Sequence, residues 1–248
     1  MSDTHLSSSS GKVSSLRKGL HIIASASNQS PRILSSANCR AQARLPLPQA
    51  LRKGTRVRPL LAGSVAPRTE VALARLLGAK SSTFEDISAA ATISLHIARE
   101  SRSHVVFCNS FGITLERLEA EPESAALSAY ARYILDVGLE GDSIKLWIAV
   151  VACLVGYGEV GLWLARESKK SKEEGGWVVT EGNPYQQWID VYNGKEYQDA
   201  VRVGIEALES RIAKDPPSRK RLEDWATVWE TCVKLEIAFW DMSMNMSY

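Results

Sequence analysis

The sequence predicts an all-α protein, in which a helical bundle over residues 67–248 follows a basic extension over residues 1–66. Beyond residue 70, apolar residues recur at spacings of three and four, which is the period of one face of a helix. No stretch of useful length alternates polar and apolar residues as a strand does, and no internal repeat is visible. A length of 248 residues fits one domain with an extension.

The extension differs from the rest of the chain in charge and composition. Residues 1–66 are rich in Ser, Arg and Lys without a sustained hydrophobic period, which predicts disorder. Residues 1–68 hold eleven Lys or Arg and one acid, Asp3, which leaves nineteen basic and twenty-seven acidic residues for the remainder. The net charge of +2 therefore combines a basic arm with an acidic body. A basic, acid-poor start is also typical of a mitochondrial transit peptide. The scattered charges, with no aromatic residues among them, argue against nucleic acid as a partner.

The cysteine pattern and the hydropathy indicate the cellular compartment and whether the chain spans a membrane. The four cysteines form no CxxC pair, which disfavours a zinc ribbon or a redox dithiol. Free cysteines at this density fit a reducing compartment, so the cytoplasm is expected, with the mitochondrion as the alternative. The longest apolar run, over residues 146–158, falls short of the roughly 18 residues of a membrane span. We therefore expect a buried helix there and no membrane partner.

Local signals delimit the helices of the first half of the domain. Apolar positions predict a helix over residues 70–80, and Thr83 is a suitable N-cap for a second helix over residues 84–111. Gly112 ends that helix. A short turn follows at Thr114, and a further helix is predicted over residues 124–138.

The second half begins with a long apolar helix that Asp142 caps and that runs to about residue 168. Residues 169–182 are charged and contain glycine, which predicts a loop. Asn183 as N-cap and Pro184 at the first helical position start a helix that ends near Gly194. Two more helices are predicted over residues 196–214 and 218–244, separated by a pair of prolines.

The last helix places a carboxyl group on an apolar face. Glu236 falls in the middle of this face, where a charge is costly unless it is paired, hydrogen-bonded or protonated. Desolvation is expected to raise its pKa and to make it a candidate proton shuttle. The structural alternative is a buried Glu tied to a Tyr or to the backbone. The residues that share the face are Leu222, Trp225, Trp229, Cys232, Phe239 and Trp240.

The long helix carries Cys153 and Tyr157 four residues apart, and therefore on one face. Three glycines cluster around them, which indicates close packing of another helix or room for a ligand. The alternative is that Cys153 is a small buried hydrophobic residue, as most buried cysteines are. Tyr130, Trp188 and Tyr192 add aromatic edges that are more often core than ligand contacts.

A competing hypothesis is a metal site, as in a metal-dependent helical oxidase. His96, Glu100, His104 and Cys108 occupy successive i,i+4 positions on one helix. No His follows His104, so the second half cannot supply the matching half of a two-metal bundle or the base of a Ser-His-Asp triad. No P-loop, GxGxxG or HExxH motif is present. We therefore expect no metal and no cofactor.

Four stretches in order carry a family resemblance: residues 129–130 (AY), 153–161 (CLVGYGEVG), 183–192 (NPYQQWIDVY) and 236–242 (EIAFWDM). They resemble the TenA or class II thiaminase family over roughly residues 70–248. Residues 84–87 (FEDI) and 104–112 resemble the version that is fused to pyrimidine kinases in fungal thiamine enzymes.

This resemblance implies a heme-oxygenase-like helical bundle, usually a homotetramer, that hydrolyses aminopyrimidines from degraded thiamine. Cys153 aligns with the nucleophile and Glu236 with the catalytic carboxylate. Tyr130, Tyr157 and Tyr192 align with tyrosines that bind the small-molecule substrate. Helix periodicity independently places Cys153 and Glu236 on inward faces.

Two departures from the family pattern leave an alternative open. The family's N-terminal His-Pro-Phe helix and its Gln-Asp-Tyr helix, whose Asp binds the pyrimidine, are not recognised here, so an N-terminally truncated bundle with an opened pocket is expected. Ala152 stands where a proline usually precedes the nucleophile. The alternative is a non-catalytic pyrimidine-binding protein or a truncated TenA-like chain.

Overall fold

The computed structural model describes residues 67–140, 142–174, 178, 181–183 and 185–245. These residues form eight α-helices and no strand, which confirms the predicted all-α class. The disorder predicted for residues 1–66 lies outside the described residues. The helices are α5 (Pro67–Ala79), α6 (Phe84–Ser110), α7 (Leu115–Glu119), α8 (Ala125–Leu139), α9 (Ser143–Glu174), α10 (Gln186–Asn193), α11 (Lys195–Lys214) and α12 (Arg219–Asn245).

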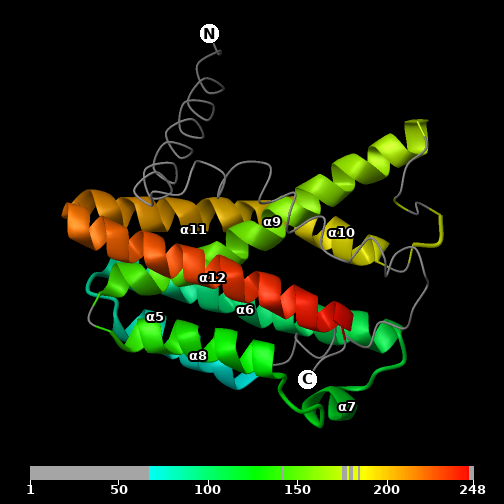
Figure 1. Cartoon of the computed structure of the whole chain (residues 1–248), viewed down its shortest axis with the longest axis horizontal. Helices are drawn as coiled ribbons and strands as arrows, with labels where there is room; N and C mark the ends of the chain where they lie inside the picture. Colours follow the sequence, from blue (N-terminus) through cyan, green and yellow to red (C-terminus); the bar gives the residue numbers. More distant parts are fainter. Residues whose placement is uncertain (1–66, 141, 175–177, 179–180, 184, 246–248) are drawn as a thin grey trace.

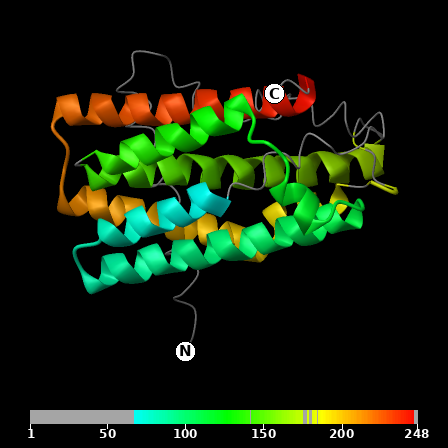
Figure 2. The ribbon, with the colours of Figure 1, turned by 90° about the horizontal axis from the view of Figure 1, so that it is seen from below.

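Helix α9 is the central element of the bundle. It contacts α8, α10, α11 and α12, and the two views show it running between α12 and the layer that contains α11 and α6 (Figures 1 and 2). By length and composition α9 could cross a membrane, so the expectation that no stretch reaches that length is wrong. Half of the relevant stretch is buried inside the structure, and core helices of soluble proteins satisfy the same criterion.

Side-chain caps begin the helices where the sequence predicts them. Thr83 Oγ1 accepts the Asp86 N–H at 3.1 Å, and Ser124 Oγ accepts the Leu127 N–H at 3.2 Å. Asp142 Oδ1 accepts the Ile144 N–H at 2.9 Å at the start of α9. These bonds satisfy backbone donors that a helix leaves unpaired at its N-terminus.

Two predicted boundaries are wrong. Helix α9 continues to Glu174, into the segment predicted as a loop, because Lys and Glu favour helix and form i,i+3 and i,i+4 ion pairs there. Helix α10 begins at Gln186 rather than directly after Asn183. Asn183 Oδ1 instead accepts the Tyr185 N–H at 2.9 Å, so its side chain forms a turn before the helix.

The apolar core consists of two clusters that meet along α9. One packs the first half of α9 against α5, α6, α8 and the N-terminal part of α12. The other packs the second half of α9 against α10 and the C-terminal parts of α6 and α12. Cys153 packs against the first cluster and Tyr157 against the second, so the predicted site lies where the two clusters join.

Gly161 sets the distance between α9 and α10. A Cβ atom added at Gly161 would lie 2.6 Å from the Tyr192 carbonyl carbon and 2.9 Å from the Asn193 backbone nitrogen. Because backbone cannot move aside as a flexible side chain can, we expect Gly161→Ala to destabilise the fold by about 1–3 kcal/mol.

Gly78 on α5 provides the matched control. It has no atom within 4 Å of its added Cβ, so Gly78→Ala is expected to leave stability unchanged or raise it by up to about 1 kcal/mol. Urea denaturation of both variants checks the prediction. Equal midpoints for the two variants would contradict it.

Candidate active site

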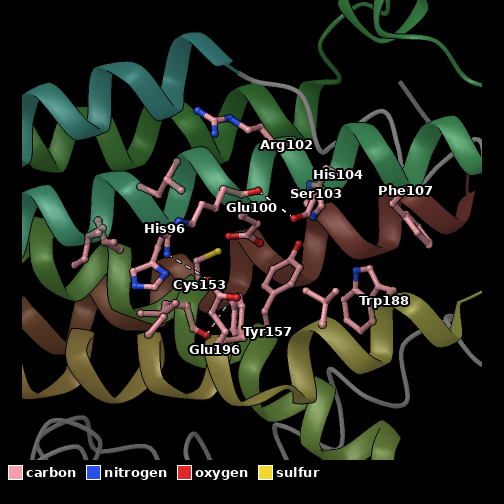
Figure 3. Close-up of a pocket in the computed structure, with 18 of the residues that line it drawn as sticks. His96, Glu100, Arg102, Ser103, His104, Phe107, Cys153, Tyr157, Trp188 and Glu196 are labelled. Carbon is pink, nitrogen blue, oxygen red and sulfur yellow. Dashed lines mark hydrogen bonds and ion pairs between the residues drawn. The ribbon is translucent and has the colours of Figure 1, made fainter.

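A cavity of about 760 Å³ lies between α6, α8, α9, α11 and α12, with part of its wall from α10. Its walls are mostly apolar and aromatic, with a few polar groups among them. Figure 3 shows His96, Glu100 and His104 on α6 facing the space that Cys153, Tyr157 and Trp188 also border. The polar and aromatic residues in the wall include Glu100, Tyr130, Cys153, Tyr157, Trp188, Glu236 and Trp240.

The structure brings the two predicted catalytic residues to the same cavity. Cys153 comes from α9 and Glu236 from α12, 83 positions later in the chain. Glu236 is buried, and its Oε1 meets no donor at hydrogen-bonding geometry among the described residues. The hydroxyl of Tyr130, on α8, is buried and unpaired by the same criterion. Unpaired buried polar atoms are costly and rare, so these two atoms mark a place where a polar ligand is expected.

Burial raises the pKa of Glu236 to about 7. Tyr130, Tyr157 and Trp240 oppose this rise, because their polar groups approach the carboxyl and favour its charged form. Tyr130 comes close enough to act on the pKa although its hydroxyl does not reach full hydrogen-bonding geometry. A carboxyl with a pKa near neutrality exists in both forms and can take up and return a proton in one reaction cycle.

Burial also raises the pKa of the Cys153 thiol well above its ordinary value, and the carboxyls of Glu236 and Glu100 raise it further. The side chain is half-buried, and Cys153 lines the cavity. Reactive cysteines usually gain their thiolate from a nearby cation or a helix N-terminus. Cys153 instead rests as a neutral thiol, so its addition to a substrate requires a base that removes the proton during the step.

Tyr157 lies between the Glu236 carboxyl and the aromatic side chains of the cavity wall. Its ring centroid lies 5.6 Å from that of Trp240 and 6.2 Å from that of Trp188. Trp188 and Tyr192 are in turn 4.3 Å apart. Aromatic surfaces of this kind favour a flat aromatic ligand through stacking and edge contacts.

Tyr192 lies behind the cavity wall rather than on it. It is 1% exposed, and its hydroxyl donates to Glu100 Oε1 at 2.7 Å. His104 Nε2 lies 2.8 Å from the same hydroxyl. Of the three tyrosines predicted to bind substrate, Tyr130 and Tyr157 therefore line the cavity, while Tyr192 supports a residue that lines it.

Two of the four residues of the alternative metal site belong to this hydrogen-bond network. Glu100 and His104 both bond to the Tyr192 hydroxyl. Within the described ranges, no group of three or more His, Cys, Asp or Glu side chains is arranged to hold a metal ion.

The sequence did not predict that Glu100 and Trp240 line the cavity. Trp240 is four residues after Glu236 on the same helix face, so a signal was available for it. Glu100 stood out only as a possible metal ligand, because its true partner is 92 residues away.

A family model described as the TENA/THI-4/PQQC family matches residues 70–246. The chain belongs to this family. The match covers α6 to α12 entirely and all but the first three residues of α5, and it includes every cavity residue named above.

Curated proteins that are similar in sequence to this TENA/THI-4/PQQC chain include a fungal and a bacterial protein. A putative hydroxymethylpyrimidine/phosphomethylpyrimidine kinase 2 from Schizosaccharomyces pombe is 33% identical over 166 residues, which are 67% of this chain and 28% of that protein. An aminopyrimidine aminohydrolase from Halalkalibacterium halodurans is 30% identical over 143 residues, 57% of this chain and 58% of that protein. The matched region thus spans less than two thirds of either relative.

Solved structures of the family share the fold. A TenA family transcription regulator from a Silicibacter species has a TM-score of 0.72 at 26% identity, with 92% of this chain and 96% of that chain covered. A putative TenA-like thiaminase from Sulfolobus solfataricus has a TM-score of 0.62 at 18% identity, with 95% and 98% covered. The resemblance predicted from the sequence motifs is therefore confirmed.

Proposed function

We propose that this protein is an aminopyrimidine hydrolase of thiamine salvage, which replaces an exocyclic amine of a thiamine-derived pyrimidine with a hydroxyl group. The observation that carries the proposal is the convergence of Cys153, Glu236 and the unpaired Tyr130 hydroxyl in one aromatic-walled cavity. The similarity to proteins named aminopyrimidine aminohydrolase supports it.

The proposed reaction begins when the Cys153 sulfur bonds to an electron-poor ring carbon while the thiol proton passes to the Glu236 carboxylate. The bond from the exocyclic methylene to nitrogen then breaks, and Glu236 returns the proton to the departing amine. Water adds to the methylene and gives a proton to Glu236. The bond between sulfur and ring carbon breaks last, and the thiol regains its proton. The sum is substrate plus water to hydroxymethylpyrimidine plus ammonia.

The pKa of each group suits its step. Glu236, with a pKa of about 7, can be both acceptor and donor at neutral pH. The raised pKa of Cys153 makes its thiolate a transient species, which needs the neighbouring carboxylate to form. No step requires an oxidant or a second substrate other than water.

Ammonia release from 4-amino-5-aminomethyl-2-methylpyrimidine by the purified chain tests the proposal. Equimolar ammonia and hydroxymethylpyrimidine are expected. A chain that is helical by circular dichroism, binds the pyrimidine and releases no ammonia would make this protein a pyrimidine-binding protein instead. A folded chain that neither binds nor turns over the compound would refute the pyrimidine assignment altogether.

A further inference from the structure

The exposed residues of the cavity wall show where the cavity opens to solvent. Most of the described wall is buried or half-buried, and its exposed residues all lie on α6 or where α10 leads into α11. The cavity therefore reaches the surface between these two parts of the chain, while α8, α9 and α12 supply inner walls. The exposed wall residues are Arg99, Arg102 and Ser103 on α6, and on the other side they include Val191, Lys195 and Glu196.

An ion pair crosses this opening. Arg99 Nη1 on α6 lies 3.3 Å from Glu196 Oε1 on α11, and both side chains line the cavity. The two residues are 97 positions apart, so the pair joins two separate elements rather than successive turns of one helix. Figure 3 shows Ser103 on α6 and Glu196 beside α11, with the cavity between the two helices. The pair therefore narrows the opening whenever it is formed.

The ion pair is suited to open and close. The Arg99 side chain is 62% exposed and that of Glu196 is 76% exposed, so water and dissolved ions compete for both charges. Exposed ion pairs of this kind contribute little free energy and separate readily. The layer beneath is held more firmly, because the Tyr192 hydroxyl donates to Glu100 Oε1 at 2.7 Å in a partly buried position. The opening thus has a movable outer layer above a fixed inner wall.

We propose that the substrate enters and leaves the cavity between α6 and the start of α11, and that the Arg99–Glu196 ion pair is a gate across this opening. The proposal rests on the proposed function for the identity of the molecule that passes. It assigns neither residue a contact with the bound substrate. A gate raises the barrier to passage in both directions and leaves the free and bound states unchanged, so it alters rates and not affinity.

Stopped-flow fluorescence with the full chain measures both rates without turnover. The probe is 4-amino-5-hydroxymethyl-2-methylpyrimidine, the product of the proposed reaction, and Trp188 and Trp240 in the wall supply the signal. Glu196→Gln is expected to raise the association and dissociation rate constants by the same factor, about two- to fivefold, because an exposed pair is weak. The dissociation constant is expected to stay within about twofold of the wild-type value. Added salt is expected to accelerate the wild-type chain in the same way and Glu196→Gln no further.

Glu206→Gln is the matched control, because Glu206 pairs with Arg202 at 3.0 Å on α11 and is not among the described residues of the wall. Its rate constants are expected to equal those of the wild-type chain. Ser103→Phe places a larger side chain in the opening and is expected to slow both rates by at least about tenfold. Ser88→Phe, at an exposed position on α6 outside the described wall, is the control for that variant.

Alkylation of Cys153 by iodoacetamide tests the opening independently of any pyrimidine. Cys153 lines the cavity, so the reagent must pass the same opening to reach its sulfur. Ser103→Phe is expected to slow the labelling by at least about tenfold, and Glu196→Gln is expected to speed it about two- to fivefold. Mass spectrometry of the peptide that contains Cys153 measures the rate.

Each contrary result removes a separate part of the proposal. Binding and labelling rates that are unchanged in Glu196→Gln would remove the gate. Rates in Ser103→Phe equal to those in Ser88→Phe would place the entrance elsewhere. A changed affinity at an unchanged association rate in Glu196→Gln would make Glu196 a binding contact instead of a gate. A wild-type chain that does not bind the pyrimidine, with labelling rates that follow the expected order, would refute the proposed function and support the opening and its gate.

Discussion

Replacing Cys153 with Ala is expected to reduce ammonia release by at least about 1,000-fold while the chain stays folded. The thiol is the group that forms the covalent bond in the proposed reaction, so its removal stops that step. Cys153 is half-buried beside the cavity, so removal of its sulfur costs little packing. Ammonia release and the circular dichroism spectrum of the variant are the measurements.

Cys232 supplies the matched control for this experiment. It is a free cysteine that is fully buried in the core and does not line the cavity. Cys232→Ala is expected to lower stability by about 1–2 kcal/mol through lost packing and to keep the catalytic rate. Wild-type turnover in Cys153→Ala, or equal loss in both variants, would remove Cys153 from the role of nucleophile.

Replacing Glu236 with Gln is expected to lower kcat/KM by about 100- to 10,000-fold and to change its dependence on pH. In the proposed reaction the carboxylate form takes the thiol proton. Since the pKa of Glu236 is about 7, kcat/KM of the wild-type chain is expected to rise with pH through that value. The variant has no group that titrates there, so this limb of its profile is expected to disappear.

The same substitution is expected to increase stability above neutral pH, which gives a readout that does not depend on turnover. The pKa of Glu236 is raised from 4.5 to about 7 in the folded chain. Its contribution to stability is therefore complete below pH 4.5 and is lost as the pH rises through about 7. Relative to Glu236→Gln, the wild-type chain is expected to lose on the order of 3 kcal/mol over this range.

Glu223→Gln on the same helix is the control, because Glu223 is an exposed carboxylate. Its stability curve is expected to run parallel to that of the wild-type chain. Urea denaturation between pH 4 and pH 8 measures all three proteins. Parallel curves for the wild-type chain and Glu236→Gln would show that Glu236 does not carry the raised pKa.

The two proposed catalytic residues were accessible from the sequence because the evidence for them is local. A carboxyl in the middle of the apolar face of α12, and a thiol four residues from a tyrosine on α9, follow from a period of 3.6 residues. Helix starts at Thr83, Ser124 and Asp142 were accessible for the same reason, since a cap joins groups at most three residues apart.

The tertiary structure decided which faces meet. From the sequence of α6 alone, Glu100 was a candidate metal ligand. In the folded chain it lines the cavity and accepts a hydrogen bond from Tyr192 of α10. Tyr192 was predicted to contact the substrate, but packing between α10 and α6 places it behind the cavity wall. Gly161 allows this approach, because any Cβ there would collide with the backbone of α10. Helix periodicity records which side of a helix is buried, but the partner of that side depends on packing between segments that are distant in the chain.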